Sequence, residues 1–307
     1  MQGFSQFCDP IQKGYRKRMS DPFEIVPAIP KDTVRAAKAI FGSSNFYILI
    51  GERLQAILER LHLHFSVERE DVSQLHAILL ALITLFQFIE GLTDVQAIDA
   101  VRTRIDWKFA LHLSLLPAIL HEHELCHFRQ KVLDDTRNQA EFQKLIDRVS
   151  LSIPSRSHSL QNLKTLEAVS FVCLVNCLDQ AQQAMNDALA VLAARFPEWL
   201  RKVALPHWYG RYNHATPRLE VALLLGQQQF FIEETRADIH HLLEEIQRSG
   251  IPDMSDIHEV KVLEQIWSRQ LLNKCCFEDA DNSVRLRVIN CPACMPENSF
   301  STCLRKI

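Results

Sequence analysis

The sequence predicts a mainly α-helical protein, because apolar residues recur at helical spacing, glycine is scarce and almost no stretch alternates as a strand would. Hydrophobic residues make up 47% of the 307 residues and charged residues 23%, values typical of a globular protein. Eight glycines are too few for the many tight turns of an all-β fold. We expect one short strand, at residues 284–289.

Charge and hydropathy limit the classes of protein to consider. The net charge of -3 excludes polyanion binding by bulk electrostatics, so a nucleic-acid surface would have to be local. The first ten residues lack the apolar core of a signal peptide, and the longest apolar run, 77–89, is shorter than the roughly 18 residues that span a bilayer. Nine scattered cysteines indicate reduced thiols rather than a disulfide framework. We therefore expect a cytoplasmic protein without a membrane partner.

Residues 32–90 predict three helices. Asp32 caps the first, which ends at residue 40. The second spans 45–60, with apolar residues three to four positions apart. The third, 72–90, is apolar on nearly all sides and should be the central buried helix. Gly91 is placed to end it as a C-cap residue.

The segment that follows predicts a helix-turn-helix-like layout. Thr93 and Gln96 form a capping-box pattern that starts a helix over 93–104, and a second helix is expected over 119–133. The outward face of the first helix should carry Asp94, Asp99, Arg102 and Arg104. If the segment contacts DNA, the candidate residues are Arg102, Arg104, Lys108, Arg129 and Lys131. Acidic neighbours nearly cancel these charges, so a solvated helical face is the alternative.

The second half predicts further helices and a change of character near the end. The expected helices span 138–149, 160–192, 219–225, 230–249 and 257–272. Aromatic residues at 206–212 suit a packed loop. The resulting domains are a basic flexible arm at 1–20, a helical domain at 21–150, a helical region at 151–272 and a cysteine-containing tail at 273–307.

Two patterns point to zinc. His123, Glu124 and His127 spell the motif of a helical metalloprotease site, with two ligands four residues apart and a general base between them. No downstream segment offers an obvious third ligand, so ordinary surface or packing histidines are the alternative. Cys291 and Cys294 could hold zinc in the tail, but the preceding cysteines are adjacent and cannot easily both chelate one ion. The alternative is a set of unselected thiols.

A longer pattern resembles a known family. The runs QFIEGLTD at 87–94 and AVRTRIDWKFAL at 100–111 resemble the InsH-like N-terminal domain of insertion-sequence DDE transposases. The stretches PEWL at 197–200 and PHWYGRY at 206–212 resemble, more weakly, a helical insertion in one branch of these enzymes. The resemblance implies DNA as the partner, in the form of terminal inverted repeats.

The same resemblance implies an RNase-H-like catalytic core in which three carboxylates hold two Mg²⁺ ions. The family's first aspartate stands in an Asp-Ser-Thr-His motif, and the matching positions here are Ser155 to His158, so serine replaces that carboxylate. The strands that carry the other two carboxylates are not expected before Ile307. We therefore expect this core to be absent or vestigial, with no catalytic residue and no cofactor.

Taken together, these patterns predict a transposase-derived DNA-binding protein, truncated and degenerate, without strand-transfer activity. A second copy of the chain is a candidate partner, in a homodimer. Two alternatives from other classes stay open. One is a zinc-dependent hydrolase that uses His123, Glu124 and His127. The other is a helical dimerisation or interaction protein.

Overall fold

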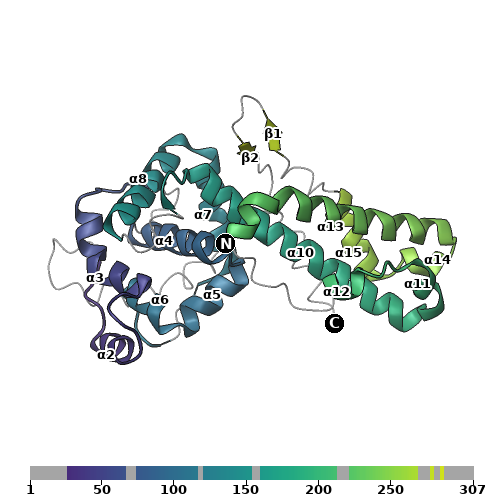
Figure 1. Cartoon of the computed structure of the whole chain (residues 1–307), viewed down its shortest axis with the longest axis horizontal. Helices are drawn as coiled ribbons and strands as arrows, with labels where there is room; N and C mark the ends of the chain where they lie inside the picture. Colours follow the sequence, from purple (N-terminus) through teal and green to yellow (C-terminus); the bar gives the residue numbers. More distant parts are fainter. Residues whose placement is uncertain are drawn as a thin grey trace, which may run out of the picture. The chain divides into compact units, whose positions relative to one another are not determined.

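The computed structural model (Figure 1) describes residues 26–66, 74–116, 120–153, 160–212, 221–268, 277–279 and 284–286. These residues are mainly helical, which confirms the predicted fold class. The chain divides into two compact units, one of Met1–Ile89 with Asp94–Val169 and one of Glu90–Thr93 with Ser170–Ile307. The division between Val169 and Ser170 falls within a long helix.

The described residues of the first unit form helices and their connections. Its helices are α2 (Lys31–Ile40), α3 (Phe46–Glu59), α4 (Gln74–Glu90), α5 (Asp94–Thr103), α6 (Ile105–Ala110), α7 (Glu122–Asp134), α8 (Thr136–Ser152) and the start of α10 (Thr165–Arg195). The middle of α4 is buried on every side, as its sequence predicts. Asn45 caps α3 by accepting the backbone N–H groups of Tyr47 and Ile48.

Two glycines in this region have a specific role. Gly91 adopts φ 64° after α4, which confirms its predicted place as a helix-ending residue. Gly51 lies where α3 meets α6, and a Cβ atom there would come within 2.6 Å of Phe109. This close approach is open only to glycine, so α3 and α6 pack with their backbones unusually near each other.

His112 ties the end of α6 to other parts of the first unit. Its ring nitrogens lie 2.6 Å from the carbonyl oxygen of Pro27 and 2.9 Å from that of Gly51. The residue is buried and has φ 54°. The segment before α2 is thereby held against α3.

The second unit contains the remaining part of α10 and the helices that follow. These are α11 (Pro197–Val203), α12 (Trp208–Tyr212), α13 (Val221–Ser249), α14 (Pro252–Ser255) and α15 (His258–Ser268), followed by β1 (Phe277–Asp279) and β2 (Val284–Leu286). The stretch predicted as a packed loop at 206–212 contains α12 instead, and the two helices expected over 219–249 form the single helix α13. Cys173 and Cys177 in α10 are buried and outside any disulfide, as predicted. Cys126 in α7 is disulfide-bonded, so the prediction of reduced thiols is wrong for that residue.

The two strands pair antiparallel, with Phe277 opposite Leu286 and Asp279 opposite Val284. The strand predicted at 284–289 is therefore present over its first three residues, and residues 287–289 lie outside the described part. Its partner β1 was not predicted. Among the described residues, no single helix is long and apolar enough to cross a membrane, although α4 and α5, bent by 108°, pass that test as a pair.

Candidate nucleic-acid interface

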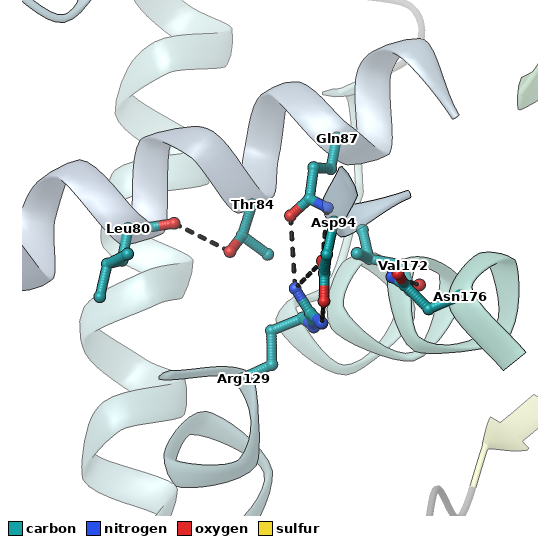
Figure 2. A network of polar contacts seen from close by, with 7 residues as sticks. All are labelled: Leu80, Thr84, Gln87, Asp94, Arg129, Val172 and Asn176. Atoms are coloured by element: carbon teal, nitrogen blue, oxygen red, sulfur yellow. Dashed lines mark hydrogen bonds and ion pairs between the residues drawn. The ribbon is translucent and has the colours of Figure 1, made fainter. Parts of the chain in front are cut away.

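The structure separates the five predicted DNA-contacting cations by their exposure. Arg129, in α7, is fully buried. Its guanidinium donates to both carboxylate oxygens of Asp94, at 2.8 and 2.6 Å, and one of its nitrogens lies 3.3 Å from the side-chain oxygen of Gln87 (Figure 2). Gln87 in turn donates to Asp94 at 2.8 Å. The group forms a closed polar network between α4, α5 and α7.

This network revises two predictions. Asp94 was expected on the outward face of its helix, and that prediction is wrong, because the carboxylate is buried against Arg129. Arg129 was expected to face DNA, but it has no exposed surface through which to reach a phosphate. The other two contacts drawn in Figure 2 are local, from Thr84 to the Leu80 carbonyl within α4 and from Asn176 to the Val172 carbonyl within α10.

Lys108 is likewise withdrawn from solvent, with 2% of its surface exposed. Its ammonium group donates to the carbonyl oxygens of Ser114, Leu115 and Leu116 at 3.2, 3.1 and 2.8 Å. Burial lowers the pKa of this amine. The positive charge holds together the loop after α6, so Lys108 also leaves the set of candidate DNA contacts.

Arg104 lies half-buried between α5 and α6. Its guanidinium makes a bidentate ion pair with Asp106, at 3.0 and 2.6 Å, and lies 5.2 Å from the ring centroids of both Tyr47 and Trp107. Much of its charge is thus already compensated inside the first unit. Its side chain keeps 27% of its surface exposed, so it can contribute only an edge to an interface.

Arg102 and Lys131 remain as the more accessible candidates. Arg102 is exposed at the end of α5, and its guanidinium lies 3.4 Å from the carbonyl oxygen of Leu120. Lys131 is partly exposed in the last turn of α7. Of the five predicted cations, Arg102 is therefore the one best placed to meet a ligand in solution.

The residues of the zinc-protease motif are not arranged around a common point. Glu124 accepts the backbone N–H of His121 at 2.8 Å and lies 3.3 Å from the His76 ring, while His123 and His127 are exposed. Burial alone would raise the pKa of Glu124, but the bonds from His76 and His121 lower it below its usual range. No group of three or more metal-ligating side chains occurs among the described residues. Ser155, His158, Cys291 and Cys294 lie outside the described residues.

A second polar cluster, in the second unit, was not predicted from the sequence. The buried carboxylate of Asp238, in α13, accepts hydrogen bonds from Arg211 at 2.5 Å and from the Tyr212 hydroxyl at 2.8 Å, and the His207 ring lies 2.9 Å away. Arg211 also pairs with Glu234 at 2.8 Å. The cluster attaches α12 to α13. In the sequence, the one hint of it is that His207 and Arg211 stand within the aromatic stretch 206–212.

The charges of this cluster support one another. Burial alone would raise the pKa of Asp238, but hydrogen bonds from His207 and Tyr212 and the charge of Arg211 lower it overall. Burial and the nearby Asp238 carboxylate raise the pKa of Tyr212, so its hydroxyl stays a donor. The carboxylate is held by three side chains, and the cluster fastens α12 to α13.

The first unit is thus a helical domain in which a buried polar network joins α4, α5 and α7. Residues 38–131, from the end of α2 to the last turn of α7, match the family described as Transposase domain (DUF772). The predicted resemblance to a transposase is thereby confirmed for this segment of the chain. Searches of curated proteins and of solved structures gave no match.

Proposed function

We propose that this transposase-related protein binds DNA in the cytoplasm and does not carry out strand transfer by itself. The observation that carries the proposal is the transposase-domain match over residues 38–131. Within that segment α5 and α7 are fixed to each other by the buried Asp94–Arg129 pair. A fixed pair of helices can present charged side chains to DNA at little cost in conformational entropy.

Arg102 is the principal proposed contact, with Arg104 and Lys131 in supporting roles. Arg102 is exposed at the C-terminal end of α5, where its guanidinium can pair with a phosphate. Arg104 stacks on Tyr47 and Trp107, so its own contact would be limited to one edge of the guanidinium. Lys108 and Arg129 act on DNA binding only through the fold that they stabilise.

Fluorescence anisotropy with a labelled duplex tests the proposal. Duplexes that carry the inverted repeats flanking the gene should bind more tightly than a scrambled duplex, and affinity should fall as salt increases. Arg102→Gln should weaken binding, whereas Arg201→Gln, which removes an exposed arginine from the second unit, serves as the matched control. Absence of binding to any duplex at low salt would contradict the proposal.

The proposed lack of strand transfer rests on Ser155, which stands where the resembling family places its first metal-binding aspartate. A neutral hydroxyl is a far weaker ligand for Mg²⁺ than a carboxylate, so no cofactor is proposed. Incubation of the purified protein with repeat-bearing DNA and Mg²⁺ should give no cleaved or joined product. Metal analysis should likewise find no stoichiometric zinc. Product formation would refute this part of the proposal.

Because terminal repeats are inverted copies of each other, we also propose that the DNA-bound form is a homodimer. Two-fold symmetry in a protein matches two-fold symmetry in its site. Analytical ultracentrifugation of the protein with a duplex carrying both repeats should give two chains per duplex. A single chain per duplex at saturation would count against the dimer.

A further inference from the structure

The outward face of α2 carries three cations in a row. Lys31, Arg35 and Lys38 are spaced four and then three residues apart, which places them on one side of the helix. All three are exposed, and 61% of the Lys38 side chain is accessible. Lys31 and Lys38 are seven positions apart, which is about 10 Å along the helix axis.

The opposite face of α2 is fixed to the first unit. Thr33 and Ala37 are fully buried, and the Thr33 hydroxyl donates to the carbonyl oxygen of Leu113 at 2.8 Å. Ala37 belongs to a buried apolar cluster with Ile48 and Phe109. Figure 1 shows α2 at the edge of this unit beside α6. The three cations are thus held on a helix whose other face is packed against the first unit.

Acidic groups compensate this face only weakly. Asp32 is the acidic residue of α2, and its carboxylate accepts the Thr33 backbone N–H. Glu52 lies 3.8 Å from the Lys38 amine, with both side chains exposed, a geometry that contributes little. The N-terminal part of the sequence also carries an excess of positive charge. Residues 1–40 contain seven lysines and arginines against four acidic residues, whereas residues 41–307 contain 27 against 33.

We propose that the outer face of α2, formed by Lys31, Arg35 and Lys38, is a docking surface for the phosphate backbone of duplex DNA. The proposal rests on the proposed function and adds a contact surface that lies mostly outside the matched segment. Successive phosphates of one strand rise about 3.4 Å each along the duplex, so the row of cations spans about three phosphate steps.

A membrane surface fits this helix less well than DNA does. A helix that lies on a bilayer buries its apolar face among the lipids. In α2 that face is already used, since Thr33 and Ala37 have no exposed surface. Ile40 is the exposed large apolar side chain of this helix, so little apolar surface is left to enter a bilayer. The charged side is free to meet a partner, and a regular row of positive charges complements a regular row of phosphates.

The test compares two triple variants of the full-length chain. One carries K31Q, R35Q and K38Q, and the control carries R201Q, K202Q and R248Q, which remove the same charge from exposed sites of the second unit. Binding to a mixed-sequence duplex is followed by anisotropy from low to moderate salt. The α2 variant should lose about tenfold or more in affinity, and its slope of log affinity against log salt should fall by about two to three. The control should keep both values.

Each other outcome has a distinct meaning. Unchanged affinity and slope in the α2 variant would overturn this surface while leaving the proposed function intact. Equal losses in both variants would show a bulk charge effect and also overturn it. Failure of the unmodified chain to bind DNA would overturn both proposals. Anionic phospholipid vesicles form a second arm, in which loss of vesicle binding by the α2 variant, with DNA binding kept, would replace DNA by a lipid surface.

Circular dichroism establishes that the variants are folded. The substituted side chains are exposed, so the helix content should not change. If the triple variant were unstable, the single variant Arg35→Gln would test the same surface with a smaller expected effect. It should lower the salt slope by about one, and an unchanged slope would contradict the surface.

Discussion

The two units each contain a carboxylate bound by an arginine, but the two clusters differ in their access to water. In the first unit, the side chain of Arg129 has no exposed surface and that of Asp94 has 4%. In the second, Asp238 is equally buried, yet Arg211 keeps 21% of its side-chain surface exposed and His207 keeps 49%. If the ion pair in the first unit is broken, water cannot reach either charged group to replace the lost partner. In the second cluster, water can reach Arg211 and His207, so the contribution of this cluster to stability should depend on pH and salt concentration.

The largest expected effect is on the first cluster. Arg129→Met leaves the Asp94 carboxylate buried without its positive partner, so the free energy of unfolding of the first unit should fall by about 3–5 kcal/mol. Trp107 is the single tryptophan of this unit, the other three being Trp199, Trp208 and Trp267. Urea unfolding of a chain with those three replaced by phenylalanine, followed by Trp107 fluorescence, measures the change.

A paired variant checks the reason for that loss. If the cost comes from the unpaired carboxylate, Asp94→Leu combined with Arg129→Met should recover much of the stability, because both charges are then absent. Recovery would show that the pair selects an arrangement of α5 and α7 more than it adds net free energy. If the double variant were as unstable as the sum of the two single variants, this explanation would be wrong.

A smaller effect is expected in the second unit. Asp238→Asn keeps the size of the side chain but removes the charge that accepts bonds from Arg211 and Tyr212, and hydrogen bonds to charged groups contribute about 1.5–3 kcal/mol. Because Arg211 can turn toward water, the loss should lie below that for Arg129→Met. Fluorescence of Trp208, which is buried beside this cluster, reports the change. Asp253→Asn, at an exposed site, should leave the stability unchanged.

The pH dependence of stability should distinguish the second cluster further. Burial opposes ionisation of Asp238, but His207, Tyr212 and Arg211 lower its pKa below the usual 3.8 overall. A carboxylate with a lowered folded-state pKa stabilises the protein fully above its unfolded-state value, and this contribution is lost as the pH falls through the folded value. The stability difference between the wild type and Asp238→Asn should therefore be constant near neutral pH and shrink below pH 3.8. A difference that grows on acidification would contradict this assignment.

The helices of this protein follow from local rules, and most were predictable. Asn45 and Gly91 are found at the ends of helices because their side-chain or backbone properties suit those positions whatever surrounds them. The position of the α5–α6 junction was harder to predict from the sequence. Arg104 is extended between two helices, and its stacking on Tyr47 depends on a helix far away in the sequence.

The candidate site was harder to predict, because a charged residue in a sequence gives no sign of whether it is buried with a partner. For Arg129, the sequence held one indication that the side chain is buried. It lies on the same side of α7 as Leu125, Cys126 and Val132, all of which are buried. By helical spacing it belongs to the inward face, and its charge alone suggested otherwise. Its partner Asp94 could not be inferred, because the two are 35 residues apart and meet only through packing.

The smallest expected effect on stability belongs to Arg102, and it gives the clearest contrast with Arg129. Arg102→Gln removes an exposed charge whose contact within the protein is a long one, 3.4 Å from the Leu120 carbonyl, so the unfolding free energy should change by less than about 0.5 kcal/mol. The same variant should lower DNA affinity and reduce the salt slope by about one. Calorimetry and anisotropy on one preparation measure both quantities. A stable Arg102 variant that binds DNA normally would remove α5 from the interface, whereas an unstable Arg129 variant would leave the assignment of α5 unaffected.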